Sequence, residues 1–168
     1  MEKRTLTLSQ KQIFDMTQIE DGDYSISAIA TFQGRGNVEY MKTCLETLYE
    51  NNQIFHVSFD YDGVEMKQYL DEEKSYTVQV NEFPSWEKFE QWKANVETLA
   101  IDYQHLFDLY GFTIGEQEFG LYIRMHHIIS DATSIGIVIC RFNDLYHAAL
   151  GEREFELVCG DFMAALEE

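Results

Sequence analysis

The sequence predicts an α/β (α+β) fold, because strand and helix patterns alternate along the chain in the order βαβ…βαββα. The clearest strand covers residues 119–126, where apolar side chains recur with a period of two. The clearest helix covers residues 135–149, whose apolar positions recur with helical spacing. Two histidines and an aspartate therefore lie where a strand ends and a helix begins, and side chains at such a junction reach open space.

The first quarter of the chain predicts a helix, a strand and a second helix. Ser9 and Gln12 have the spacing of a capping box, so we expect the first helix to begin there. Residues 24–32 alternate as a strand. Asn37 then follows a glycine-containing break and is expected to cap a helix over residues 38–49.

The middle of the chain predicts a hairpin, a further strand and a helix. Asp62-Gly63 is a favourable hairpin turn, which separates predicted strands at residues 57–61 and 64–70. Residues 76–80 alternate as another strand. A helix over residues 86–99 is expected to turn its aromatic and aliphatic stripe, including Leu99, toward the core.

Composition excludes several classes of function. The chain has 168 residues, with 30 acidic against 12 basic side chains and a formal charge of −18. Nucleic acid and anionic membranes are therefore poor partners. No apolar run approaches the roughly 20 residues of a membrane span, and residues 1–5 resemble no secretion signal. We expect a soluble, cytoplasmic protein.

The three cysteines, Cys44, Cys140 and Cys159, are odd in number and far apart in the sequence. We interpret them as reduced thiols, with Cys44 and Cys140 in helices. A catalytic cysteine is the alternative, but no sequence context indicates one.

The His126-His127-x-x-x-Asp131 pattern has three interpretations when only its residues are considered. A metal site is one, although adjacent residues of a strand face opposite ways and two neighbouring histidines would not easily reach one ion. A structural role is the second, in which Asp131 caps the helix and one histidine is a hydrogen-bonded core residue. Catalysis is the third.

The stretch His126–Ser134 resembles the HHxxxDG motif of the condensation domains of non-ribosomal peptide synthetases. Chloramphenicol acetyltransferase and other CoA- or carrier-dependent acyltransferases share this motif. The apolar strand before it and the helix after it also fit. Ala132 stands where the family usually has glycine.

A second family motif, RHExLRTxF, is matched only in part by residues 51–59. Phe59 matches the last position, and Phe55 replaces leucine. The four charged or histidine positions of the motif are occupied here by Asn51, Asn52, Gln53 and His56.

The resemblance implies a basic partner for Asp131, because an arginine of the second motif commonly pairs with the motif aspartate in the family. That arginine is absent here. His56, Arg124 or Arg141 could replace it, and the sequence does not choose among them.

Two further segments resemble the family more weakly. Residues 107–109 are similar to a Pro-Phe-Asp-Leu segment that precedes two strands, and residues 160–162 are similar to a Tyr-x-Asp-Phe-Ala segment. The resemblance thus covers nearly the whole chain. It implies that residues 1–168 form a single N-terminal lobe, without the second lobe of the family. The expected fold is a chloramphenicol acetyltransferase-like two-layer sandwich lobe, with a mixed sheet flanked by helices.

The resemblance also implies a reaction. In an intact condensation domain, donor and acceptor carrier proteins bring thioesters on phosphopantetheine arms to a tunnel between the lobes, and an amide forms. His127 would act at the acceptor amine, either as general base or by positioning it and stabilising charge. His126 and Asp131 would shape the loop. We expect no metal and no directly bound cofactor.

Two alternatives remain for the function. The chain could be a fragment of a CoA-dependent acyltransferase, or a degenerate or excised lobe that only binds carriers or a partner. In either case we expect part of an acyltransferase fold that does not catalyse by itself, because the tunnel needs a second lobe.

Overall fold

The computed structural model describes residues 2–19, 22, 24–152 and 154. Its elements in chain order are β1 (Arg4–Thr5), α1 (Leu8–Thr17), β2 (Ser25–Gln33), α2 (Val38–Glu50), the 3-10 helix η1 (Gln53–His56), β3 (Val57–Tyr61), β4 (Met66–Leu70), β5 (Gln79–Phe83), α3 (Trp86–Val96), β6 (Phe107–Ile114), β7 (Glu118–His126) and α4 (Ala132–Ala149). The strands and helices therefore alternate much as the sequence predicts.

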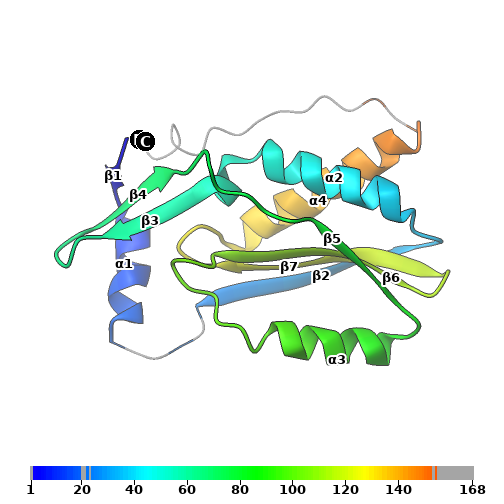
Figure 1. Cartoon of the computed structure of the whole chain (residues 1–168), viewed down its shortest axis with the longest axis horizontal. Coiled ribbons are helices and arrows are strands. Elements are labelled where there is room, and N and C mark those ends of the chain that lie inside the picture. Colours follow the sequence, from blue (N-terminus) through cyan, green and yellow to red (C-terminus); the bar gives the residue numbers. More distant parts are fainter. Residues whose placement is uncertain (1, 20–21, 23, 153, 155–168) are drawn as a thin grey trace.

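The main sheet has four strands in the order β2-β7-β6-β5 (Figure 1). The β5–β6 pair is parallel, whereas β2–β7 and β6–β7 are antiparallel, so the sheet is mixed as expected. The register places Ser25 opposite His126 at one end and Gln33 opposite Glu118 at the other. The predicted histidine junction thus lies at one end of the two neighbouring strands β2 and β7.

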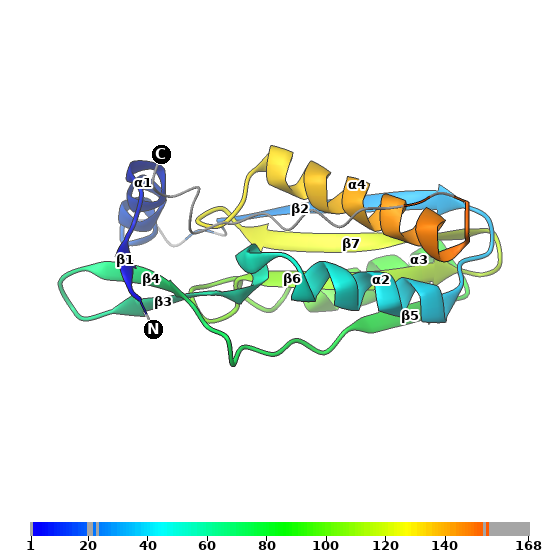
Figure 2. The same ribbon diagram turned by 90° about the horizontal axis from the view of Figure 1, so that it is seen from above.

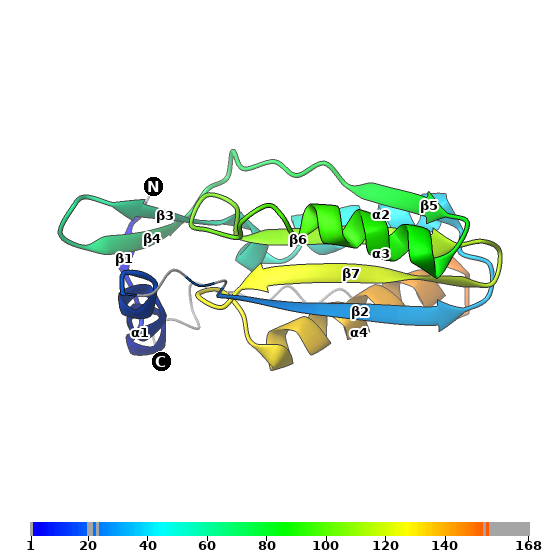
Figure 3. The same cartoon turned by 90° about the horizontal axis from the view of Figure 1, so that it is seen from below.

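Helices cover both faces of this sheet. Helices α2 and α4 pack against each other on one face (Figure 2), and α3 lies on the opposite face (Figure 3). Strands β6 and β7 are buried along nearly their whole length, because they are central and covered from both sides. No helix in the described ranges is long and apolar enough to cross a membrane.

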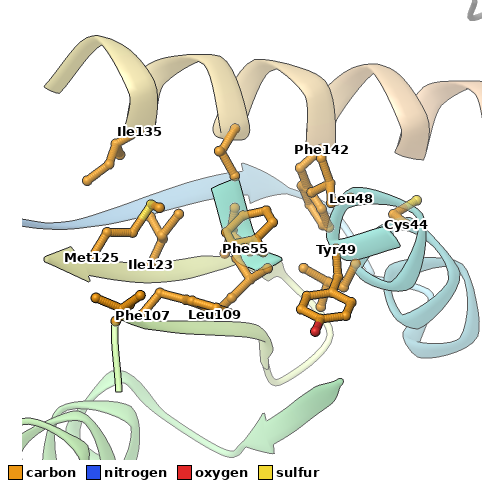
Figure 4. Packing of buried hydrophobic residues seen from close by; sticks show 14 of the residues in the cluster. Cys44, Leu48, Tyr49, Phe55, Phe107, Leu109, Ile123, Met125, Ile135 and Phe142 are labelled. Atoms are coloured by element: carbon orange, nitrogen blue, oxygen red, sulfur yellow. The ribbon is translucent and has the colours of Figure 1, made fainter. Parts of the chain in front are cut away.

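The larger hydrophobic core lies between the sheet and the α2–α4 pair. Figure 4 shows Ile123 and Met125 of β7 facing α4, whose side chains Ile135 and Phe142 point toward the sheet. The side chains of Leu48, Ile123 and Phe142 are fully buried. A smaller aromatic cluster fills the opposite face under α3; its buried members are Phe89, Phe112, Ile114 and Tyr122. The alternation of β7 therefore divides its side chains between two cores.

A second, smaller sheet has the order β1-β4-β3, and α1 lies beside it at the same end of the molecule as the histidine junction (Figure 1). The tilted rings of Phe14 and Tyr61, with centroids 5.6 Å apart, join α1 to the β3–β4 hairpin. The N-terminal helix is thus placed close to the end of β7.

The predicted start of α1 is wrong by two residues. Thr7 is the N-cap: its Oγ1 accepts from the backbone N of Gln10 at 3.2 Å, and the Gln10 side chain accepts from the backbone N of Thr7 at 2.9 Å. This is a capping box with the same spacing as the predicted Ser9 and Gln12. Two overlapping patterns fit the sequence, and burial of Gln10 selects the earlier one.

The second strand of the hairpin begins later than predicted, at Met66. Asp62 Oδ1 accepts from the backbone N of Val64 at 2.9 Å and of Glu65 at 2.8 Å. These bonds hold residues 62–65 in a turn, so they do not join the ladder.

Two further boundaries differ from the sequence prediction. Strand β5 begins at Gln79, and the hydroxyl of the preceding Tyr76 donates to the carbonyl of Leu109. Helix α3 ends at Val96, and Leu99 is 59% exposed. Leu99 therefore lies outside the inward stripe, because the chain turns just after the helix.

Other local predictions are confirmed. Asn37 caps α2, and its Oδ1 accepts from the backbone N of Tyr40 at 3.1 Å. Cys44 in α2 is a buried free thiol whose pKa is raised to about 11 by burial, and Cys140 in α4 is an exposed free thiol. Cys159 and residues 160–162 lie outside the described residues.

Candidate active site: the histidine loop

Residues 126–131, here called the histidine loop, connect the end of β7 to the start of α4. The backbone N of His126 donates to the carbonyl of Leu106 at 2.8 Å, and that of His127 to the carbonyl of Tyr24 at 2.7 Å. Leu106 precedes β6 and Tyr24 precedes β2. The sheet thus holds both histidines from its two neighbouring strands.

His126 is a hydrogen-bonded core residue. Its side chain is buried, and its Nδ1 accepts from the backbone N of Ile128 at 3.0 Å. Because Nδ1 accepts, the proton of the neutral ring is on Nε2. The centroid of its ring also lies 5.3 Å from the centroid of the Tyr103 ring. The structural interpretation of the sequence is therefore confirmed for the first histidine.

His127 is exposed, in contrast to its neighbour. Its Nδ1 lies 3.2 Å from the carbonyl oxygen of Ser130. A carbonyl only accepts, so Nδ1 carries the proton and the lone pair of the neutral ring is on Nε2. The loop itself therefore selects the tautomer of His127 and leaves the Nε2 lone pair of an exposed side chain available.

Two more hydrogen bonds close the loop on itself. The carbonyl of His126 accepts from the backbone N of Ile129 at 3.1 Å and from the hydroxyl of Ser130 at 3.0 Å. Ile128, Ile129 and Ser130 are all buried. The exposed His127 is thus followed by three buried residues that hydrogen bonds within the loop help to hold in place.

Asp131 is the N-cap of α4. Its Oδ1 accepts from the backbone N of Ser134 at 2.7 Å and from the Ser134 hydroxyl at 2.8 Å. These bonds lower the pKa of the Asp131 carboxyl below its ordinary value. The cap predicted from the sequence is confirmed, on a residue that is exposed.

The expected ion pair of Asp131 is not formed. Arg124 binds Asp108, Arg141 donates to the side chain of Asn52, and Nε2 of His56 lies 3.0 Å from the carbonyl of Tyr49. None of the ion pairs among the described residues includes Asp131. Each candidate partner contacts another group instead.

Residues 51–56 have a structural explanation for their departure from the family motif. Asn52 is buried, its Nδ2 donates to the carbonyl of Leu48, and its Oδ1 accepts from Arg141. Phe55 is fully buried in the main core. A neutral amide thus links α2 to α4 where the family motif has a histidine.

A buried ion pair lies in the strands next to the histidines, and the sequence pattern did not predict it. Asp108 and Arg124 lie opposite each other in β6 and β7, and Arg124 Nε and Nη2 donate to Asp108 Oδ2 at 2.9 and 2.6 Å. Arg124 also donates to the carbonyl of Leu99 at 2.8 Å, and His105 Nε2 lies 2.9 Å from Asp108 Oδ1. The period of two in β7 predicts that Arg124 and His126 face the same side of the sheet. Only the register of β6 against β7 shows that Asp108 is the partner of Arg124.

The described residues hold no group of three His, Cys, Asp or Glu side chains that could bind a metal ion. A hollow of about 510 Å3 lies at the far end of β2 and β7 from the histidines, with Phe32, Phe119 and Tyr146 in its lining. It is not part of the histidine loop.

Comparison with known proteins identifies the family. The condensation-domain family matches residues 2–160. The chain belongs to this family. Curated relatives of this condensation domain include surfactin synthase subunit 1 of Bacillus subtilis (strain 168), which is 27% identical over 132 residues, 77% of this chain and 4% of the relative. A plipastatin synthase of the same organism is 28% identical over 137 residues, 80% of this chain and 5% of the relative.

Solved structures share the fold of this condensation domain. The starter condensation domain of rhizomide synthetase RzmA matches with a TM-score of 0.84 and 15% identity, over 99% of this chain and 44% of that one. The X-domain in complex with OxyB from teicoplanin biosynthesis matches with a TM-score of 0.78 and 17% identity, over 99% and 38%. The predicted chloramphenicol acetyltransferase-like arrangement of a mixed sheet flanked by helices is confirmed. The chain spans less than half of these structures.

Proposed function

We propose that this chain is the N-terminal lobe of a peptide-synthetase condensation domain. In the complete domain, an amide forms between a donor acyl thioester and an acceptor aminoacyl thioester, each on a carrier protein. The observation that carries the proposal is the contact of His127 Nδ1 with the carbonyl oxygen of Ser130, which assigns the proton of the exposed neutral ring to Nδ1 and the lone pair to Nε2. Family membership supplies the class of reaction.

His127 acts at the acceptor amine. Imidazole gives and takes protons readily near neutral pH, so Nε2 can accept the proton that the amine loses as the amide forms. The same lone pair can instead orient the amine and stabilise its developing charge. His126 and Asp131 shape the loop, the first through the backbone N of Ile128 and the second as the cap of α4.

The substrates arrive as thioesters on phosphopantetheine arms, with no cofactor bound by the lobe itself. One solved variant of the rhizomide starter domain is in complex with C8-CoA and Leu-SNAC, an acyl thioester and an aminoacyl thioester. We extend that pair of substrate classes to this chain. Donor and acceptor carrier domains are then its partners, in a cytoplasmic reaction.

A second lobe is the remaining requirement. His127 lies on an exposed part of the surface, so one lobe leaves the ring open to water. Orientation of two reactants can contribute about 7–11 kcal/mol, and most of that is lost when one wall of a tunnel is missing. The isolated lobe is therefore expected to fold without catalysing.

The altered second motif favours one alternative function, a lobe that only binds carriers. Asn52 and His56 occupy positions where the family motif has histidine and arginine, and Arg141 is committed to Asn52 rather than to Asp131. The histidine loop would then persist for its structural role alone.

The test is a chimera in which this chain replaces the corresponding lobe of a plipastatin synthase condensation domain. Amide formation from loaded donor and acceptor carriers would be compared for the chimera, its His127→Ala variant and the isolated chain. We expect an active chimera, a loss of about 100-fold or more in His127→Ala, and no product from the isolated chain.

Two outcomes would contradict this proposal. A folded chimera that binds both carriers but forms no amide supports the carrier-binding alternative. Amide formation by the isolated chain at the rate of the chimera, lost in His127→Ala, would show that one lobe is sufficient.

A further inference from the structure

A buried pair of glutamines connects α1 to the histidine loop. Gln10 Nε2 donates to the side-chain oxygen of Gln68 at 2.8 Å and to the backbone carbonyl of Ile128 at 3.2 Å. Gln10 is 7% exposed and Gln68 is fully buried. The hydrogen bond from Gln10 to Ile128 joins residues that are 118 positions apart in the sequence.

Every polar atom of the two side-chain amides is used. Gln10 Oε1 accepts from the backbone N of Thr7 at 2.9 Å and from Gln68 Nε2 at 2.8 Å. Gln68 Nε2 also donates to the carbonyl of Thr5 at 3.1 Å. A fully satisfied buried network of this kind is rigid, because breaking any one bond leaves a polar group unpaired in the interior.

The carbonyl of Ile128 receives its hydrogen bond from outside the loop. The carbonyls of His126 and Ser130 accept from groups of the loop itself, namely Ile129, Ser130 and the His127 ring. Ile128 lies between His127 and Ser130, so the direction of its carbonyl sets the turn that brings these two residues together. Gln10 holds that direction.

A second contact joins the same helix to the first histidine. The Thr17 hydroxyl lies 2.6 Å from the Tyr103 hydroxyl, and the Tyr103 ring lies 5.3 Å from the ring of His126. Helix α1 is therefore connected to the loop at two places through different groups.

We propose that Gln10, supported by Gln68, is a positioning residue for His127. It holds the Ile128 carbonyl so that the Nδ1–H of His127 stays hydrogen-bonded to the carbonyl of Ser130 and Nε2 faces outward. The importance of that orientation for amide formation rests on the proposed function. The geometric effect does not. An amide suits this task, because it donates and accepts at once and carries no charge that would change with pH.

The experiment measures the tautomer of His127 in the 168-residue chain by long-range nitrogen–proton NMR of the histidine rings, assigned with His127→Gln. The main variant is Gln10→Met with Gln68→Met, because replacing both partners of a buried hydrogen bond by apolar groups of similar size keeps the fold better than removing one. Gln12→Met is the matched control, since Gln12 is an exposed glutamine of the same helix.

We expect the parent and Gln12→Met to carry the His127 proton on Nδ1. The double variant should shift toward the Nε2-protonated form that predominates in free imidazoles of histidine. Gln10→Glu serves if the double variant does not fold. It keeps both acceptor bonds and loses both donor bonds, to Gln68 and to Ile128, so the same shift is expected. In the chimera, Gln10→Met should lower the turnover number more than it raises the KM for the acceptor carrier.

The proposal is overturned if a folded double variant or Gln10→Glu retains the Nδ1 proton, or if the parent itself carries the proton on Nε2. These NMR results do not depend on catalysis. An inactive chimera with the expected tautomer shift would contradict the proposed function and leave the positioning role supported. An unshifted tautomer in an active, His127-dependent chimera would do the reverse.

Discussion

Two aspartates lie near the histidines, and their environments differ. Asp108 is 1% exposed and accepts from Arg124 and His105, whereas Asp131 is exposed and accepts from Ser134 at the start of α4. The family resemblance implies an ion pair on Asp131. In the structure the buried ion pair belongs to Asp108 instead.

The difference shows that burial decides which carboxylate needs a countercharge. A carboxylate removed from water is costly unless it is paired and hydrogen-bonded, and Asp108 has an arginine directly across the ladder. An exposed carboxylate is already solvated, and a surface ion pair contributes about 0–1 kcal/mol. Asp131 therefore keeps its place as a helix cap without the arginine of the family motif.

The largest effect is expected from Asp108→Asn. The change leaves Arg124 charged and buried without its partner, which typically costs about 3–5 kcal/mol of unfolding free energy. Urea unfolding of this variant and of the matched Asp131→Asn would measure the contrast. Equal losses in the two variants would mean that the buried pair has no special weight.

A smaller effect is expected from Asp131→Ala. Loss of an N-cap side chain typically costs about 1 kcal/mol, or a fall of about 2–4 °C in Tm for a chain of this size. Asp131→Ser should retain most of the stability, since serine also caps. A loss as large as that of Asp108→Asn would reveal an interaction of Asp131 beyond the cap.

The smallest effect is a pH dependence of the unfolding free energy. Its sign at His105, beside Asp108, is opposite to its sign at Asp131. The hydrogen bond to Asp108 raises the pKa of His105, so this stabilisation is present below about pH 6.5 and is lost as pH rises through the raised value. The lowered pKa of Asp131 gives the reverse: stabilisation present above about pH 3.9 and lost as pH falls through its folded value.

Melting curves from acid to mildly alkaline pH would separate the two contributions. In a plot of Tm against pH, His105→Gln should flatten the slope near neutral pH. Asp131→Ala should flatten the slope in acid. Because His105 is partly exposed, its contribution is expected to be below about 1 kcal/mol. A slope near neutral pH that is unchanged in His105→Gln would assign it to another group.

The sequence alone was sufficient for features that depend on neighbouring residues. The alternation of residues 119–126, the helical spacing after Ala132 and the caps at Asn37 and Asp131 are local patterns, and the structure confirms them. Helix caps and strand periodicity are properties of a few adjacent residues, so they can be predicted without a partner segment.

The choice between competing local patterns required the tertiary structure. The Thr7–Gln10 and Ser9–Gln12 capping boxes have the same spacing, and only the first buries its glutamine against Gln68. Residues 76–78 alternate as a strand, yet Tyr76 donates to Leu109 and pairing begins at Gln79.

The roles of the two histidines were likewise decided by the tertiary structure. Adjacent residues at a strand end look alike in sequence, but in the fold His126 is buried and His127 is exposed. The partners of Asp108 and of the Ile128 carbonyl come from Arg124 and Gln10, which are 16 and 118 residues away. Such contacts depend on strand register and helix packing across the whole chain, and these are set by the burial of many side chains together.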